Sequence, residues 1–340
     1  MILTQAPLRV SFVGGGTDLA EFYQHRPGRV ISAAINKYVY VLVNPTPLID
    51  QYTVKYAKTE LVTRVEDLEH TRVRAALLDL GITTGGLEIG SFADLPSKTG
   101  LGSSSSFSVA LLSCLHTYRA QRVTSQSLAE AASRLEIDIL GEPIGKQDQY
   151  AAAFGGVHIY QFNPDGSVEV EPVAVPTMHI RDLEACSILF YTGLTRHASS
   201  VLSEQKKNTT AKREVLSRMA DSVSEFARLM QNGKIADMGV MLHEGWLLKK
   251  SLASGISSQI IDELYDAGCA EGAWGGKVLG AGGGGCLLFL APKAKREAIS
   301  VKLSAIAARN ELEGYREVPI TYGEPGCKIL VNNLRPLHLI

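Results

Sequence analysis

The chain has 340 residues, of which 45% are hydrophobic and 20% charged, which is the composition of a folded globular protein. Its 34 Lys and Arg residues balance 35 Asp and Glu residues, and a net charge of −1 offers no basic field for a nucleic acid. Five Cys without a Cys-x-x-Cys spacing argue against a disulfide framework or a zinc site, and no apolar run is long enough to span a membrane. We therefore expect a cytoplasmic protein without a membrane or nucleic-acid partner.

The first half of the chain predicts mixed strands and helices. Stretches of β-branched and aromatic residues that stop at Gly or Pro predict strands over residues 9–13, 38–43, 51–57 and 86–90. Apolar faces predict helices over residues 103–119 and 125–140. The turn sequence Asn163-Pro-Asp-Gly166 predicts a hairpin between residues 157–162 and 168–175.

The second half opens with a predicted strand at residues 186–191. Helices are predicted over residues 197–208, 212–232, 235–253, 260–267 and 293–310, with a closing strand pair at 315–322 and 327–331. Pro172 and Pro176 interrupt the pattern, so we place the junction near residues 175–182 and expect two domains, 1–176 and 177–340.

The first of three glycine-rich segments ends a strand with Gly14, Gly15, Gly16, Thr17 and Asp18. Three glycines allow the backbone to approach a ligand closely, and Asp18 can accept hydrogen bonds from vicinal hydroxyls. A ligand site is therefore favoured over a tight turn in which Asp18 only caps a short helix. Leu19 occupies the place of the third glycine, so the segment is not a dinucleotide fingerprint.

The second segment, residues 94–106, runs directly into a helix. Successive backbone N–H groups at a helix N-terminus, together with serine hydroxyls, form an anion site, to which Lys98 adds a charge. No Gly-Lys-Ser/Thr closes it as in a Walker loop, and a flexible linker or a simple cap would not need four serines before an apolar helix. We predict phosphate binding by Lys98, Thr99, Gly100, Leu101, Gly102, Ser103, Ser104 and Ser105.

The third segment, residues 277–292, contains Gly280, Gly282 and Gly285 in a Gly-x-Gly-x-x-Gly spacing. An apolar strand follows instead of a helix, so a dinucleotide site is excluded by context. Close packing against a ligand or another glycine loop and a plain hairpin turn both remain open.

Two acidic residues are candidates for the chemistry of phosphoryl transfer, which needs metal ligands and a group that orients the attacking hydroxyl. Asp148 lies in a Lys-Gln-Asp-Gln cluster before an alanine-rich helical start. Glu136 lies on the predicted helix 125–140. From position alone, Asp148 is either catalytic or part of a solvated turn, and Glu136 is more typical of a helix surface.

In this order and spacing the three segments resemble the motifs of the GHMP kinases, the superfamily of galactokinase, homoserine kinase and mevalonate kinase. The similarity covers most of the chain, and Pro96-x-x-x-Gly-Leu-Gly-Ser-Ser-Ser105 is its most specific part. The resemblance implies an α+β fold with an N-terminal domain like ribosomal protein S5, a ferredoxin-like C-terminal domain, and an active site between them. It also implies ATP and Mg²⁺ as cofactors.

By the same resemblance, Asp148 orients or deprotonates the acceptor hydroxyl and Arg9 supports it. Ser104 and Glu136 match the magnesium ligands. The third motif is expected to brace the phosphate loop and the acceptor, with Gly282 and Gly283 in contact with substrate.

Departures from the family narrow the acceptor. Galactokinase has Glu and His where this chain has Gly15 and Gly16, so the side chains that hold galactose are missing while Asp18 remains. Residues 9–19 and 191–205 resemble the branch of heptose 7-phosphate kinases, and fucose kinase domains share parts of them. This resemblance implies phosphorylation of the anomeric C1 hydroxyl of D-glycero-D-manno-heptose 7-phosphate, on the route to GDP-heptose for surface polysaccharide.

A substrate that already carries a phosphate needs a cationic pocket. Arg196 is the first candidate, with Lys37 and Arg29 behind it, although Arg196 could equally pair with a carboxylate. Thr195 is expected to contact the substrate beside Arg196. Two alternatives stay open: another acceptor such as fucose, galactose or mevalonate, and a catalytically silent regulator that binds ATP and sugar. The expected partners are small molecules, and a homodimer is compatible with the sequence.

Overall fold

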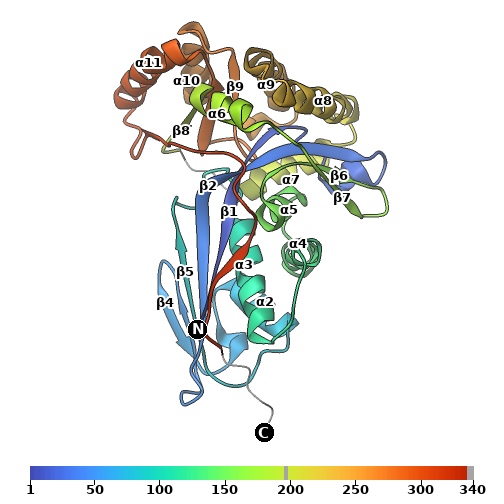
Figure 1. Cartoon of the computed structure of the whole chain (residues 1–340), viewed down its shortest axis with the longest axis vertical. Helices are drawn as coiled ribbons and strands as arrows, with labels where there is room; N and C mark the ends of the chain where they lie inside the picture. The colour runs from blue at the N-terminus through green and yellow to red at the C-terminus, as the bar shows by residue number, and fades with distance from the viewer. Residues whose placement is uncertain (195–197, 335–340) are drawn as a thin grey trace.

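Two β-sheets organise the molecule, one in each half of Figure 1. The computed structural model describes residues 1–194 and 198–334. The strands of the larger sheet are β1 (Ile2–Val13), β2 (Gly28–Pro45), β3 (Tyr52–Lys55), β4 (Thr59–Val62), β5 (Leu87–Ala93), β6 (Val157–Phe162), β7 (Val168–Pro172) and β12 (Lys328–Asn332). Their order is β12-β1-β2-β5-β3-β4, and β6 and β7 join through β2.

The long strand β2 pairs with two strands on the side away from β1. Its residues 28–33 pair with β6, and its residues 39–45 pair with β5. The pairing of β1 with β2 shifts register next to Pro7, which has no N–H to donate to the ladder. The sheet thus divides around β2, and the end of β1 at Val13 leads into the first glycine-rich segment.

Helices cover one face of this sheet (Figure 1). They are α2 (Thr71–Asp79), α3 (Ser103–Tyr118), α4 (Ser125–Ser133), the π-helix η2 (Arg134–Ile139) and α5 (Gln147–Phe154), with short α1 (Ala20–Tyr23) and η1 (Val65–Asp67) in connections. α3 lies against β1 and β2, and it begins directly after Gly102, whose φ of 80° ends the preceding loop. The phosphate loop is therefore fixed to the central strands.

The smaller sheet is antiparallel, with the order β11-β8-β10-β9. Its strands are β8 (Ser187–Tyr191), β9 (Gly275–Val278), β10 (Cys286–Leu290) and β11 (Arg316–Glu317). The helices of this half are α6 (Thr177–Cys186), α7 (Ala198–Asn208), α8 (Arg213–Gln231), α9 (Ile235–Lys250), α10 (Gln259–Ala270) and α11 (Arg296–Arg309), with the short 3₁₀ turns η3 (Ser254–Ile256) and η4 (Lys293–Lys295).

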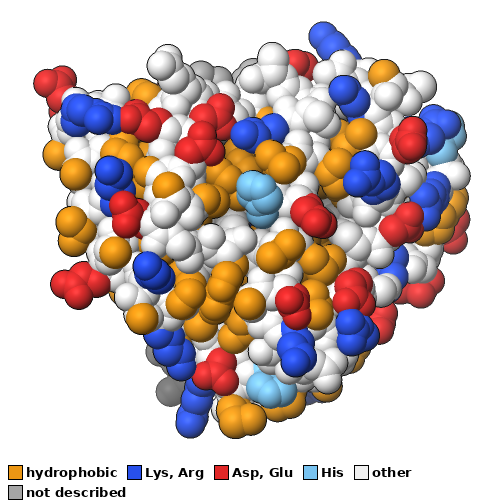
Figure 2. Space-filling model, turned by 90° about the horizontal axis from the view of Figure 1, so that it is seen from above, with side chains coloured by type: hydrophobic (Ala, Val, Ile, Leu, Met, Phe, Trp, Pro, Cys, Tyr) orange, Lys and Arg blue, Asp and Glu red, His pale blue; other side chains and the backbone are white. Residues whose placement is uncertain are grey.

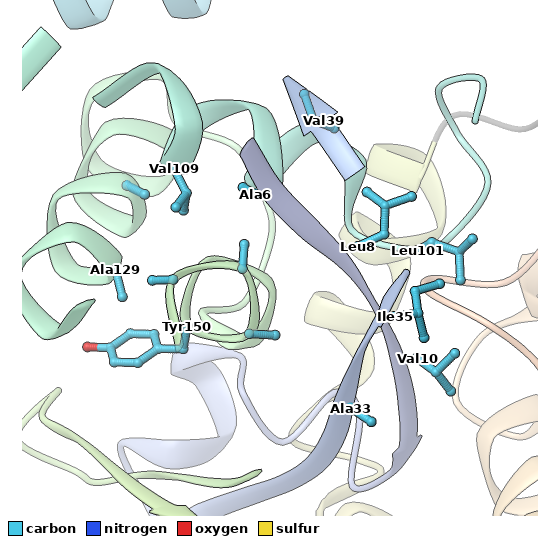
Figure 3. Packing of buried hydrophobic residues seen from close by; sticks show 14 of the residues in the cluster. Ala6, Leu8, Val10, Ala33, Ile35, Val39, Leu101, Val109, Ala129 and Tyr150 are labelled. Atoms are coloured by element: carbon cyan, nitrogen blue, oxygen red, sulfur yellow. The ribbon is translucent and has the colours of Figure 1, made fainter. Parts of the chain in front are cut away.

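The hydrophobic core reaches the phosphate loop. In Figure 3 the side chain of Leu101 lies beside those of Leu8, Val10 and Ile35 from the central strands. Leu101 is fully buried, and the backbone N–H of Arg9 donates to its carbonyl at 3.0 Å. Leu101 therefore anchors the loop to β1 from below and does not face solvent.

The two-domain α+β architecture is confirmed, together with the predicted hairpin, the helices at 103–119 and 125–140, and the strand–loop–strand arrangement at 277–292. The closing strand pair was predicted wrongly. β11 pairs with β8, whereas β12 returns to pair with β1, as the red strand in Figure 1 shows. The division between residues 176 and 177 stays a prediction, and β12 has to be counted with the first sheet.

Charged side chains of both signs lie on the surface. Figure 2 shows acidic and basic side chains interspersed over one face, without a broad field of a single sign. Among the described residues, no helix combines the length and apolar character that crossing a membrane requires.

Candidate active site

A cavity of about 450 Å³ lies where the three glycine-rich segments meet. The predicted residues that line it are Arg9, Gly15, Gly16, Asp18, Lys98, Gly100, Gly102, Ser103, Ser104, Ser105 and Asp148. Gly280 and Ala281 face the same space. The structure therefore brings all three segments to one site, between the larger sheet on one side and α7, α9 and the loop 279–285 on the other.

Arg9 and Asp148 form the central ion pair of this cavity. Arg9 Nε donates to Asp148 Oδ1 and Arg9 Nη2 to Asp148 Oδ2, both at 2.8 Å, which is the bidentate geometry that fixes a carboxylate most firmly. Arg9 Nη1 donates to the carbonyl of Gly100 at 2.7 Å. Arg9 is almost fully buried, whereas a quarter of the Asp148 side chain is exposed toward solvent.

The N-terminus of α3 provides the anion-binding part of the cavity. The N–H group of Ser106 is the first to bond within the helix, to the carbonyl of Gly102 at 2.9 Å. The preceding N–H groups, those of Ser103, Ser104 and Ser105, have no acceptor within the helix and lie at its positive end. These residues line the cavity, so the loop can hold phosphate oxygens as predicted.

The third glycine-rich segment braces the phosphate loop directly. A Cβ atom on Gly280 would lie 2.6 Å from the Cα atom of Gly100, and one on Gly100 would lie 2.4 Å from the carbonyl oxygen of Leu279. The N–H of Cys286 also donates to the carbonyl of Thr99 at 2.9 Å. Backbone packs on backbone here, which excludes the alternative of a plain hairpin turn.

Asp18 is buried and does not cap the short helix α1 that follows it. Its Oδ1 accepts from the N–H of Gly16 at 2.9 Å, and its Oδ2 accepts from the N–H of Gln147 at 3.4 Å. Short helix α1 has no side-chain cap, so the capping alternative is wrong. Burial raises the pKa of Asp18 against the effect of these backbone bonds, and the charge of Asp148 raises it further.

Glu136 is fully buried beneath the phosphate loop, on the π-helix η2. Its two oxygens accept hydrogen bonds from Ser105 Oγ and Ser108 Oγ at 2.8 Å, from Gln149 Nε2 at 2.5 Å and from Arg72 Nε at 3.3 Å. The π-helical turn that carries Glu136 is a feature common at functional sites. The surface alternative for Glu136 is therefore wrong.

The predicted magnesium ligands, Ser104 and Glu136, do not contact each other among the described residues: Ser104 lines the cavity, whereas Glu136 is fully buried. Carboxylate and hydroxyl oxygens are donors that Mg²⁺ prefers, and the exposed Ser104 lines the cavity, so the residues suit the ion chemically. In the described structure, however, Ser105 and Ser108, not Ser104, donate to Glu136. The ligand roles of Ser104 and Glu136 stay predictions.

The sequence did not point to four charged residues of this cavity: Arg72, Glu142, Lys249 and Lys277. Arg72 from α2 bridges Glu136 and Glu142, at 3.3 and 2.6 Å. Its helix could have been found, since Val73, Ala76 and Leu77 have helical spacing and are buried. Burial raises the pKa of Glu142.

Two buried lysines lie on the opposite wall. Lys249 from α9 donates to the carbonyl of Gly280, and burial, with a contribution from the charge of Arg9, lowers its pKa to about 8. Lys277 donates to the carbonyls of Ser11 and Phe12 at 2.9 and 2.7 Å, and burial lowers its pKa well below the ordinary range. Nothing in the sequence marks Lys249, which occurs within an ordinary helical pattern.

A second cavity of about 580 Å³ adjoins the phosphate loop and shares Arg72, Ser103 and Ser104 with the first. It has an aromatic and apolar lining that includes Tyr56, His70, Leu95 and Phe107. The rings of His70 and Phe107 lie 5.2 Å apart between centroids. Burial lowers the pKa of His70, which favours the neutral ring. Such a pocket suits a flat aromatic group joined to the phosphates.

Several predicted positions lie outside the cavity wall, among the residues that the structure describes: Gly14, Thr17, Thr99, Leu101, Gly282 and Gly283. Thr17 closes the first turn by donating to the carbonyl of Gly14 at 2.8 Å, and the N–H of Gly283 donates to the carbonyl of Ile256 at 2.8 Å.

The candidate cations for an acceptor phosphate are placed unequally. Arg29 pairs with Glu171 at 3.5 Å, and Lys37 donates to the carbonyl of Asn36 at 3.2 Å; neither lines the cavity. The side chains of Thr195 and Arg196 lie outside the described residues. Their predicted roles in substrate binding stay predictions.

Known proteins resemble this chain over nearly its whole length. The family model described as the GHMP kinases N-terminal domain matches residues 62–156, and the one described as GHMP kinases C-terminal matches residues 226–308, together more than half of the chain. A D-glycero-alpha-D-manno-heptose 7-phosphate kinase from Campylobacter jejuni is 27% identical over 92% of this chain and 94% of its own. A galactokinase from Thermococcus kodakarensis is 25% identical over 88% and 92%.

Among solved structures, a D-glycero-D-manno-heptose 1-phosphate kinase from Bacteroides thetaiotaomicron has a TM-score of 0.80 at 22% identity, covering 98% of this chain and 99% of its own. At that identity the likeness establishes the fold. The two heptose kinases are named for phosphates at different positions, so the names alone leave the acceptor position open.

Proposed function

This chain belongs to the GHMP kinases, and from that premise we propose that it is an ATP-dependent sugar kinase whose acceptor is D-glycero-D-manno-heptose 7-phosphate. The reaction transfers the γ-phosphoryl group to the anomeric C1 hydroxyl and yields the 1,7-bisphosphate. The product would serve the synthesis of GDP-heptose for surface polysaccharide, and we expect the enzyme in the cytoplasm.

A single observation carries the proposal: Arg9 links Asp148 to the phosphate loop. One guanidinium binds both carboxylate oxygens of Asp148 and the carbonyl of Gly100, so an acceptor-activating group and a phosphate-binding loop share one support. That juxtaposition is what direct transfer between two bound substrates needs, because rate depends on positioning the reacting atoms.

ATP fits the two adjoining cavities. Its phosphates would lie on the backbone N–H groups of Ser103, Ser104 and Ser105, and its base in the apolar pocket beside His70 and Phe107. Mg²⁺, held by Ser104 and Glu136, would neutralise charge on the triphosphate. Lys98, in the loop before Gly100, adds a positive charge to the cavity wall.

The acceptor would lie between Asp148 and the first glycine-rich segment. Asp148 accepts the proton of the attacking hydroxyl as the new O–P bond forms and the bond from the γ-phosphorus to the bridging oxygen of ADP breaks. Arg9 keeps the carboxylate in place through both oxygens. Gly15, whose Cβ position meets no atom closer than 3.7 Å, leaves room for a sugar larger than galactose, and Asp18 accepts a hydrogen bond from a hydroxyl of that sugar.

An ADP-release assay on the purified protein tests this proposal. Heptose 7-phosphate should be turned over with a kcat/KM at least tenfold above that for unphosphorylated heptose, fucose, galactose and mevalonate. Faster turnover of any of these four compounds would contradict the proposal and assign another acceptor to this kinase.

A further inference from the structure

Gln205 places a polar group without a partner in the wall of the active-site cavity. This residue of α7 is 2% exposed, and it lines the same cavity as Asp18 and Asp148. Among the described residues, its Nε2 atom has no hydrogen-bond partner. A buried N–H group without an acceptor costs about 1 to 3 kcal/mol, so a ligand or an ordered water is expected to satisfy it.

Gly16 explains where the amide sits. A Cβ atom on Gly16 would lie only 2.2 Å from Gln205 Nε2, so any side chain at this position would displace the amide. The φ of Gly16 is +100°, a backbone conformation that also favours glycine. The N–H of Gly16 donates to Asp18 Oδ1 at 2.9 Å. The side-chain amide of Gln205 therefore lies next to the Cα atom of Gly16, and the carboxylate of Asp18 accepts from the N–H of Gly16.

The end of α7 that carries Gln205 is held firmly. Thr209 Oγ1 donates to the backbone carbonyl of Gln205 at 3.0 Å, and Asn208 Nδ2 donates to the carbonyl of Leu252 at 3.0 Å. These bonds hold the backbone that carries the Gln205 side chain, as a residue that contacts a ligand requires.

We propose that Gln205 is a specificity-determining residue that donates a hydrogen bond from Nε2 to an oxygen of the acceptor sugar. This oxygen lies next to the hydroxyl from which Asp18 accepts a hydrogen bond. The inference deepens the proposed function and rests on it. A donor and an acceptor on the two sides of Gly16 match vicinal sugar oxygens, each of which can accept one bond and donate another. The contact with Gly16 places Gln205 on the acceptor side of the cavity, because the phosphate loop contacts Gly280 and Arg9 instead.

Two substitutions separate hydrogen bonding from packing. Gln205→Leu keeps the volume and removes the donor, whereas Gln205→Glu keeps the shape and leaves only acceptors. Lys207→Ala, at an exposed position of the same helix, is the control. We expect both Gln205 variants to raise the KM of heptose 7-phosphate about tenfold, the effect of one lost hydrogen bond, with the KM of ATP within twofold of wild type.

The acceptor Kd from calorimetry without ATP should rise by the same factor, and deoxy analogues identify the sugar oxygen. An analogue that lacks it should bind wild type about tenfold more weakly and should bind Gln205→Leu no worse than the parent sugar does. An unchanged acceptor KM and Kd in both variants, or an equal rise in the KM of ATP, would overturn the assignment. If wild type turns over no sugar, the proposed function fails, while the Kd values still judge Gln205.

Discussion

Arg9 binds both oxygens of Asp148 and, through its third nitrogen, the carbonyl of Gly100 in the phosphate loop. The contact is close enough that a Cβ atom on Gly102 would lie 3.4 Å from both Arg9 Cγ and Asp148 Oδ2. The carboxylate and the loop therefore cannot move independently. In the proposed reaction, this coupling fixes the attacking hydroxyl relative to the γ-phosphoryl group.

Asp148→Asn should lower kcat by about 10³-fold, because the amide cannot accept the proton of the acceptor hydroxyl. The variant keeps one oxygen for Arg9, so the Kd of ATP from calorimetry should stay close to that of wild type. Asp237→Asn, an exposed position on α9, controls for the loss of a surface charge. Wild-type turnover by Asp148→Asn would remove this residue from the chemistry.

Gly280→Ala should disrupt the contact between the third segment and the phosphate loop, because its Cβ atom would lie 2.6 Å from Gly100 Cα. Gly85→Ala is a matched control: its φ of +80° resembles the +69° of Gly280, but no atom lies within 4 Å of its Cβ position. We expect Gly85→Ala to lower the free energy of unfolding by about 1 kcal/mol from backbone strain alone.

Gly280→Ala should lower the free energy of unfolding by about 2 kcal/mol more than this control and should also raise the KM of ATP. Denaturant unfolding and steady-state kinetics measure the two effects. Equal losses of stability in both variants, with an unchanged KM of ATP, would mean that the backbone contact is unimportant.

Glu136→Gln should have two separable effects. The neutral amide accepts weaker hydrogen bonds from Ser105, Ser108 and Arg72 than the carboxylate does. Because Arg72 also loses a buried charge partner, the free energy of unfolding should fall by about 3 kcal/mol. If Glu136 also holds the metal, the Mg²⁺ concentration for half-maximal kcat/KM should rise at least tenfold, by analogy with lost metal ligation. A loss of stability with an unchanged Mg²⁺ requirement would make the residue purely structural.

Lys249→Met should change how stability depends on pH. The pKa of Lys249 is about 8 in the folded protein and 10.5 ordinarily, so between these values the unfolded chain binds more protons than the folded one. Because of this group, the free energy of unfolding of wild type increases as the pH rises from about 8 to 10.5. The variant has no lysine at this position and lacks that increase.

Below pH 8 the full penalty for the buried ammonium is present in wild type. The stability of Lys249→Met relative to wild type should accordingly fall by at most about 3 kcal/mol as pH rises through the window. Urea unfolding at pH 7.5 and 10 measures the change, with Lys302→Met at an exposed position of α11 as control. A difference that is the same at both pH values would contradict the buried ammonium.

The parts of the site that depend on short stretches of sequence could be predicted from the sequence. Glycine runs, the serines before α3 and the Asp148 cluster each have a signature within a few residues, and they do meet in one cavity. Lys249 has no such signature, because its position depends on how α9 packs against the first domain. Gln205 closes the segment 191–205 that resembles the heptose kinase branch, but its place in the cavity wall depends on how α7 packs. β12 was misplaced for the same reason: its strand pattern is local, but its pairing with β1 is not.

The most direct test of the central claim follows the phosphorus atom itself. Wild-type protein is incubated with ATP, Mg²⁺ and heptose 7-phosphate, and the reaction is followed by ³¹P NMR. We expect one anomeric phosphate ester for each ATP converted to ADP, with the 7-phosphate signal retained. ATP that stays intact, or that yields inorganic phosphate without a new sugar ester, would contradict this expectation.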